Sequence, residues 1–101
     1  MPFKTTINYS PNFSSKKRSE KQIRFIILHY TGMKSEKAAI NKLTDIQSQV
    51  ASHYLITLGG KIINLVPDLY IAWHAGISSW KTLNSLNKNS IGIEITNPGH
   101  Q

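Results

Sequence analysis

The sequence contains no cysteine and few acidic residues, with 5 Asp and Glu against 12 Lys and Arg among 101 residues. Without cysteine, a disulfide framework and thiolate metal sites are both excluded, so a metal ion would have to be bound by histidine and carboxylate side chains. The shortage of acidic residues gives a formal net charge of +7. That charge favours an acidic partner such as nucleic acid, anionic lipid or a carboxylate-rich polymer.

Long hydrophobic runs are also missing. No apolar stretch is long enough to cross a bilayer, so we expect no transmembrane segment. The amino end, Met1 to Ser10, lacks the apolar core and cleavage site of a secretory signal. We therefore expect a cytoplasmic protein, with the cell envelope as the alternative. A chain of this length supports one domain, and its 40% hydrophobic content is that of an ordinary globular protein.

The hydrophobic pattern of the first half predicts an arm, a strand and a helix. Met1 to Lys21 mixes Ser, Asn, Pro and basic residues without a period, so we predict an N-terminal arm over 1–21 and a domain over 22–101. Ile23 to Thr31 carries bulky side chains on both faces, which predicts a central strand covered by helices. Ser35 is the expected N-cap of a helix to about Ser48. Its apolar stripe would contain Ala39, Leu43, Ile46 and Val50.

The second half is predicted to be mostly strands. Two β-rich runs flank Gly59-Gly60, which is typical of a hairpin. The predicted segments are the hairpin strands Ser52 to Leu58 and Lys61 to Val66, a short strand or extended segment Leu69 to His74, a long connection Ala75 to Asn89, and an alternating strand Ser90 to Thr96. These elements predict an α/β domain with a mixed central sheet, in which the first and last strands lie near the middle.

Three histidines and one glutamate are the candidates for chemistry. By alternation His29 shares a strand face with Phe25 and Ile27, at the strand end where ligands of α/β proteins gather. The alternative is a core histidine bonded to backbone. His29, His53 and His74 could form a three-histidine zinc site, although hydrogen bonding at strand ends is the favoured interpretation for the latter two.

Glu94 interrupts an isoleucine-alternating strand, next to Gly92. It either points to solvent or lines a cavity. In a partly desolvated cavity its pKa would rise, and it could act as a general base for a metal-bound water. Trp73 and Trp80 flank the long connection, where their rings could stack on a sugar or peptide or pack in the core.

Four short motifs follow one another in a fixed order: I-I-L-H-Y-T at Ile26 to Thr31, S-H-Y-L-I at Ser52 to Ile56, A-W-H-A-G at Ala72 to Gly76, and N-S-I-G-I-E at Asn89 to Glu94. Together they resemble the zinc-dependent N-acetylmuramoyl-L-alanine amidases, which share their fold with peptidoglycan recognition proteins. S-P-N-F at Ser10 to Phe13 is also similar to the stretch before the family's first core strand. The resemblance covers essentially the whole chain and implies a mixed central β-sheet flanked by helices.

The resemblance also implies roles for individual residues. His29 matches the family's first zinc ligand and Glu94 its catalytic glutamate, while His53 and His74 match histidines that are usually not ligands. Tyr30, Trp73, His74 and Ala75 are implied to contact substrate. The implied substrate is peptidoglycan or a muropeptide, cleaved at the amide between the lactyl group of N-acetylmuramic acid and L-alanine. The implied cofactor is zinc, which would polarise the carbonyl and acidify the attacking water.

The sequence departs from the family at its carboxyl end. The family's second ligand histidine and ligand aspartate lie in a G-H-x-D-I-A-P and K-x-D-P-G region that does not occur before Gln101, and Gly99-His100 lacks the following aspartate. Ser85 and Leu86 replace an arginine often found in the family. We therefore expect the amino-terminal part of an amidase domain, truncated or split, with the missing zinc ligands supplied by another chain. Without the family's downstream helices one face of the sheet would be poorly covered, which predicts instability or self-association. A non-catalytic peptidoglycan-binding module is the alternative. Nucleic-acid binding rests on charge alone and is not expected.

Overall fold

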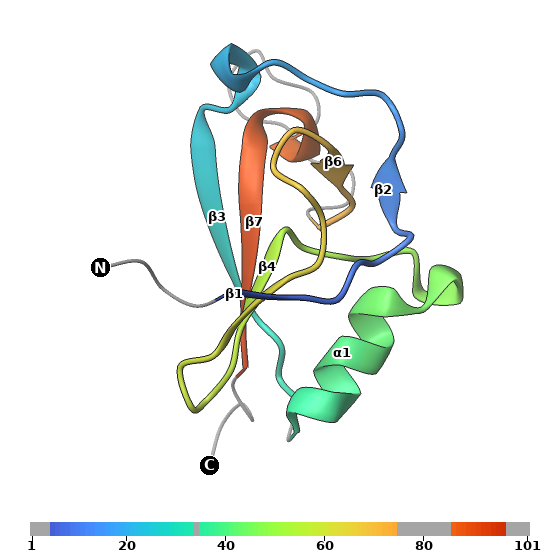
Figure 1. The fold of residues 1–101 in the computed structure, drawn as a ribbon, viewed down its shortest axis with the longest axis vertical. Coiled ribbons are helices and arrows are strands. Elements are labelled where there is room, and N and C mark those ends of the chain that lie inside the picture. Colours follow the sequence, from blue (N-terminus) through green and yellow to red (C-terminus); the bar gives the residue numbers. More distant parts are fainter. Residues whose placement is uncertain (1–4, 34, 75–85, 97–101) are drawn as a thin grey trace.

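A computed structural model describes residues 5–33, 35–74 and 86–96. Within them, five strands form one sheet in the order β1-β5-β4-β7-β3, and two form a small antiparallel ribbon, β2-β6 (Figure 1). The strands are β1 (Thr5–Ile7), β2 (Phe13–Ser14), β3 (Phe25–Tyr30), β4 (Tyr54–Ile56), β5 (Ile62–Asn64), β6 (Ile71–Ala72) and β7 (Ser90–Ile95). The helices are α1 (Glu36–Thr44) and three short 3-10 segments, η1 (Glu20–Gln22), η2 (Ile46–Ser48) and η3 (Leu86–Asn89).

The five-stranded sheet is mixed, as predicted. β7 lies between β3 and β4 and pairs with both in parallel, whereas β4 and β5 form an antiparallel hairpin. The glycine turn between those two strands is confirmed, because the Gly60 N–H donates to the Thr57 carbonyl and the Thr57 N–H donates to Lys61. Gly60 has φ +86°, a conformation that glycine adopts without strain. β1 adds to the outer side of β5 in parallel.

The strand predicted to be central lies at the edge of the sheet. Within the described residues β3 pairs only with β7. Its residues alternate between half-buried and exposed, and Ile26 and Tyr30 are 68% and 66% exposed. The prediction of a central strand covered on both faces was therefore wrong. A continuous apolar run identifies a strand, but it does not say what covers each of its faces.

The core lies on one side of the sheet, beneath α1 and the β2-β6 ribbon (Figure 1). Ala39 and Leu43 on the inner side of α1 belong to the same buried cluster as Leu55 of β4 and Ile63 of β5. Leu55 pairs in register with Glu94 of β7, so the carboxylate lies on the covered face. The isoleucines of β7 alternate to the other face, which the exposed side chains of β3 share.

The predicted helix begins where expected and ends early. The Ser35 hydroxyl accepts a hydrogen bond from the Ala38 N–H at 3.1 Å, which confirms the N-cap. The α-helix ends at Thr44 because the Asp45 side chain accepts from the Gln47 N–H and caps the 3-10 turn that follows. Ile46, predicted to belong to the buried stripe, is consequently 64% exposed.

The amino-terminal segment is part of the packed structure instead of an extended arm. Besides forming β1 and β2, it buries Asn12, whose side-chain amide donates to the carbonyls of Asp45 at 2.8 Å and Val50 at 2.7 Å. Arg18, 5% exposed, donates to the carbonyls of Asp68 and Lys88. These polar residues are buried because backbone carbonyls from distant segments satisfy their donors.

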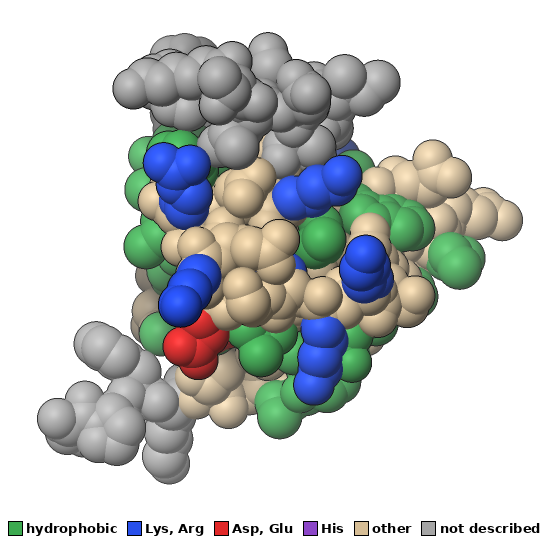
Figure 2. Space-filling view, turned by 90° about the horizontal axis from the view of Figure 1, so that it is seen from above, with side chains coloured by type: hydrophobic (Ala, Val, Ile, Leu, Met, Phe, Trp, Pro, Cys, Tyr) green, Lys and Arg blue, Asp and Glu red, His purple; other side chains and the backbone are tan. Residues whose placement is uncertain are grey.

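The strand predictions near the carboxyl end are confirmed for β6 and β7. Of the predicted connection over 75–89, residues 75–85 lie outside the described part, and the remainder forms η3. Among the described residues no helix is both long and apolar enough to span a membrane. Lys and Arg side chains are spread over the face seen in Figure 2, in keeping with the net charge of +7.

Candidate active site

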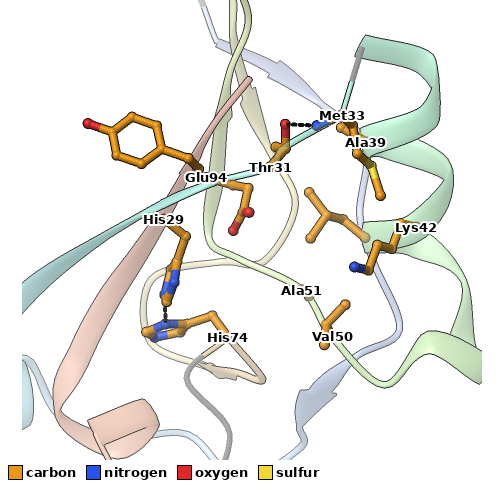
Figure 3. A pocket seen from close by; sticks show the side chains of 11 residues that line it. His29, Thr31, Met33, Ala39, Lys42, Val50, Ala51, His74 and Glu94 are labelled. Carbon is orange, nitrogen blue, oxygen red and sulfur yellow. Dashed lines mark hydrogen bonds between the residues drawn. The ribbon is translucent and has the colours of Figure 1, made fainter. Parts of the chain in front are cut away.

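His29 and Glu94 lie side by side on neighbouring strands. They are register partners in the parallel pair β3-β7, so their side chains lie on the same face of the sheet. Both line a cavity of about 210 Å³ between the sheet and α1. Figure 3 shows the two side chains directed into this space, with Lys42 of α1 on the opposite wall and His74 below. The cavity thus combines an imidazole, a carboxylate and an ammonium group.

Burial makes Glu94 a stronger base than an exposed glutamate. Desolvation in the cavity raises the pKa of its carboxyl group, and the positive charges of His29 and Lys42 oppose this rise. Because desolvation is the larger effect, the carboxylate holds a proton more readily than in water. A carboxylate with a raised pKa can take a proton from a reacting water and return it to a leaving group.

His74 connects the cavity to the interior. Its Nδ1 lies 3.1 Å from Nε2 of His29, and its Nε2 lies 3.0 Å from the hydroxyl of Ser90. Burial, followed by electrostatic interactions with His29, His53 and Arg18, lowers the pKa of His74 to about 3. The imidazole of His74 is therefore neutral at physiological pH.

His53 is fully buried behind this pair. Its Nδ1 accepts a hydrogen bond from the Gly92 N–H at 3.0 Å, and its Nε2 lies 2.8 Å from the Tyr70 carbonyl. Hydrogen bonding at a strand end, the favoured interpretation for His53, is confirmed. Within the described residues no three His, Asp or Glu side chains are grouped so that they could hold a metal ion. A three-histidine zinc site is therefore not formed by His29, His53 and His74.

Gly92 makes this arrangement possible. A Cβ atom added at Gly92 would lie 2.5 Å from Cγ, 2.6 Å from Cδ2 and 2.8 Å from Nδ1 of the His74 ring. Side-chain carbons do not approach ring atoms so closely, so any larger residue would displace the ring. A glycine inside a strand is a signal of close approach by another group, and here that group is a histidine of the site.

The sequence and fold agree with one family of known proteins. The model of the N-acetylmuramoyl-L-alanine amidase family matches residues 19–101. The chain belongs to this family. The amidase AmiD of Escherichia coli is 42% identical over 87 residues, which cover 79% of this chain and 30% of AmiD. The amidase AmpD of Haemophilus influenzae is 27% identical over 109 residues, covering 91% of this chain and 59% of AmpD.

Solved amidase structures share the fold described above. AMPDH3 from Pseudomonas aeruginosa superposes with a TM-score of 0.71 at 35% identity, covering 86% of this chain and 39% of that structure. AmiD from E. coli in complex with a muropeptide substrate superposes with a TM-score of 0.67 at 38% identity, covering 86% and 37%. The mixed α/β amidase fold expected from the motifs is thereby confirmed. The chain spans less than half the length of either structure.

The other residues that the amidase motifs predicted to contact substrate differ in their position relative to the cavity. Tyr30 lines the cavity, but it is 66% exposed and its position on β3 turns the side chain to the face opposite Glu94. Trp73 is half-buried, and its indole N–H donates to the hydroxyl of Ser14 at 3.2 Å. Ala75 lies outside the described residues, as do Trp80 and His100.

Sequence reasoning missed Lys42 as a residue of the cavity. It lies beside the apolar stripe of the helix, immediately before the buried Leu43. A lysine bordering an apolar stripe can extend along a cavity wall and keep its charged end in water. This position next to the stripe is the signal that could have identified it.

Proposed function

We propose that this chain forms part of the active site of an N-acetylmuramoyl-L-alanine amidase. The observation that carries the proposal is the pairing of His29 with Glu94 across β3-β7, with both side chains lining one cavity. These are the two residues that the family motifs mark as zinc ligand and catalytic base. The proposed reaction is hydrolysis of the amide between N-acetylmuramic acid and L-alanine.

Glu94 would carry the proton through this reaction. As a water oxygen attacks the carbonyl carbon, the carboxylate accepts a proton from that water, and the C–O bond forms. The resulting carboxylic acid then donates the proton to the departing nitrogen as the C–N bond breaks. The raised pKa of Glu94 favours the first half of this exchange, because the carboxylate accepts a proton more readily than that of an exposed glutamate.

We also propose zinc as the cofactor, with His29 as one ligand. Catalytic zinc sites use three protein ligands, and the described residues do not supply such a group. The cavity on its own therefore does not fit a zinc ion, and the remaining ligands would have to come from other residues or from a partner chain. Zinc content per chain, measured together with intact mass, tests this proposal. A chain that retains no zinc with such a partner present would contradict it.

For the substrate we propose a muropeptide, encountered in the cytoplasm during peptidoglycan turnover. The related AmiD structure contains anhydro-N-acetylmuramic acid-L-Ala-D-gamma-Glu-L-Lys, and the related AMPDH3 structure contains an anhydromuramic pentapeptide. Stem peptides carry free carboxylates, which the net charge of +7 would attract.

The test is to incubate the chain with zinc, a partner chain that supplies the remaining zinc ligands and an anhydromuramyl tripeptide, and to measure both binding and release of the stem peptide. Glu94→Gln should abolish release and retain binding, because the amide keeps the shape of the carboxyl group and cannot take the proton. Glu36→Gln is the matched control, since Glu36 forms an exposed ion pair with Lys61, 3.2 Å apart, outside the cavity lining. Release of the stem peptide at the same measurable rate by wild type and Glu94→Gln would refute the role of Glu94.

A non-catalytic peptidoglycan-binding module is the second candidate. It is favoured by the absence, within the described residues, of a group that could complete a metal site. The same experiment separates the two functions. Binding without release, with zinc and a ligand-supplying partner present, would support the module, whereas neither binding nor release would contradict both.

A further inference from the structure

A line of polar contacts runs from the cavity into the interior of the protein. His29 Nε2 lies 3.1 Å from His74 Nδ1, and His74 Nε2 lies 3.0 Å from the hydroxyl oxygen of Ser90. That hydroxyl in turn lies 2.6 Å from the carbonyl oxygen of Leu86. All three separations are hydrogen-bond distances, so the proton positions along the line depend on one another.

The contact between Ser90 and Leu86 determines which atoms along this line donate and which accept. A carbonyl oxygen has no proton, so the hydroxyl hydrogen of Ser90 must lie between the two oxygens. Ser90 then offers only lone pairs to His74, and His74 Nε2 must carry the proton that joins them. In a neutral imidazole the other nitrogen is an acceptor. Among the described residues no carboxylate is hydrogen-bonded to the His74 ring, so a second proton on it would be a positive charge without a partner, and the ring is neutral. His74 Nδ1 therefore accepts, and His29 donates to it.

We propose that His74 and Ser90 are positioning residues that keep the proton of His29 on Nε2 and leave the lone pair of Nδ1 available in the cavity. Within the described residues no hydrogen bond reaches His29 Nδ1. This inference rests on the proposed function only for its consequence, namely that Nδ1 is the atom of His29 that serves the chemistry beside Glu94. The tautomer itself follows from the contacts.

The packing around His74 keeps its ring in this orientation. Gly92 leaves the space that the ring fills, and the N–H of the same glycine is held by His53 Nδ1 on the buried side. Both nitrogens of His74 have protein partners. A substrate could therefore contact the ring carbons of His74 but would have to break one of these bonds to reach a nitrogen.

The test is to record the imidazole 15N shifts of the wild-type chain by NMR near neutral pH. Protonated and unprotonated ring nitrogens have well-separated shifts, so each tautomer can be identified directly. We expect His29 and His74 both to carry a proton on Nε2 and none on Nδ1. A wild-type spectrum in which His29 carries its proton on Nδ1, or in which His74 does, would overturn the proposal, and this measurement needs no variant.

Ser90→Ala then tests the direction of coupling. Loss of the acceptor for His74 Nε2–H should shift the nitrogen signals of His74, and through it those of His29, toward a mixture of tautomers. Ser52→Ala is the matched control, because Ser52 is equally buried and its hydroxyl also donates to a carbonyl, that of Tyr54 at 2.8 Å. Unchanged signals in Ser90→Ala, or equal changes in both variants, would contradict the proposal.

These spectra are taken without substrate, so the inference and the proposed function fail separately. If the chain shows the expected tautomers but neither binds nor cleaves a muropeptide, the inference about His29 is supported and the proposed function is contradicted. If the chain cleaves the muropeptide and His29 has the opposite tautomer, the proposed function is supported and the inference is contradicted.

Discussion

Replacing Gly92 by alanine should destabilise the protein through one contact. The new Cβ would lie 2.5 Å from Cγ of His74 and 2.8 Å from its Nδ1. The ring cannot simply turn aside, because hydrogen bonds to His29 and Ser90 hold both of its nitrogens. Either the ring moves and loses those bonds, or β7 moves away from it.

The change in the free energy of unfolding follows from two destabilising contributions and one stabilising contribution. Overpacking a buried site costs about 1–3 kcal/mol, and each of the two hydrogen bonds of His74 is worth about 0.5–1.5 kcal/mol. Alanine restricts the unfolded chain more than glycine does, which returns about 0.4–1 kcal/mol. Their sum is a net loss of about 1–5.6 kcal/mol for Gly92→Ala. The middle of that range, about 3 kcal/mol, lowers the Tm of a domain this size by roughly 12–24 °C.

This loss is measured by urea and thermal unfolding of four proteins. They are the wild type, Gly92→Ala, His74→Ala and the double variant Gly92→Ala/His74→Ala. Trimming His74 removes the clash, so Gly92→Ala should cost at least about 2 kcal/mol less in the His74→Ala background. Gly59→Ala is the control, because a Cβ at Gly59 meets no atom within 4 Å, and its effect should be close to zero or stabilising. Equal costs of Gly92→Ala in both backgrounds would refute the reasoning.

Three further predictions concern pH, the helix cap and the open face of the sheet. Between pH 3 and 6.5 the unfolded chain binds a proton at His74 that the folded chain does not, so stability should fall by up to about 1.4 kcal/mol per unit as pH drops below 6.5; urea midpoints against pH should show a weaker slope for His74→Gln. Ser35→Ala should cost about 1 kcal/mol by the same assay, and Ser35→Asp should cost little, because aspartate can also accept from the Ala38 N–H. Leu28→Lys should reduce concentration-dependent self-association in sedimentation velocity, since Leu28 is 55% exposed on the apolar face of β3; an unchanged sedimentation profile would show that this face is not the site of association.

The elements that the sequence predicted well are those with local signals. The Gly59-Gly60 turn, the N-cap at Ser35 and the alternation of Ser90 to Thr96 each depend on residues close together in the chain, and the structure contains all three. The position of His29 and Glu94 on a common face of the sheet could also be predicted in part. Each residue is assigned to a strand by its local pattern, and the parallel pairing of those strands in register then places both side chains on the same face.

What the sequence did not reveal depends on residues far apart in the chain. Asn12 and Arg18 are polar and lie in an aperiodic segment, and their burial makes sense only when the distant carbonyls that accept from them are known. The edge position of β3 depends on which strands pair with it, and hydrophobic periodicity does not contain that information. The contact between His74 and Gly92 joins two segments that meet only in the folded sheet.

The parallel pairing of β3 with β7 also determines when the protein can fold. Residues 25–30 find their only described strand partner in residues 90–95, and Arg18 finds its carbonyl acceptors at residues 68, 87 and 88. During synthesis residues 25–30 therefore leave the ribosome long before the strand that pairs with them. Non-local pairing of this kind forms slowly. The growing chain is consequently most prone to aggregate before β7 emerges, and a chaperone that shields Ile26 and Leu28 would raise the yield of folded protein.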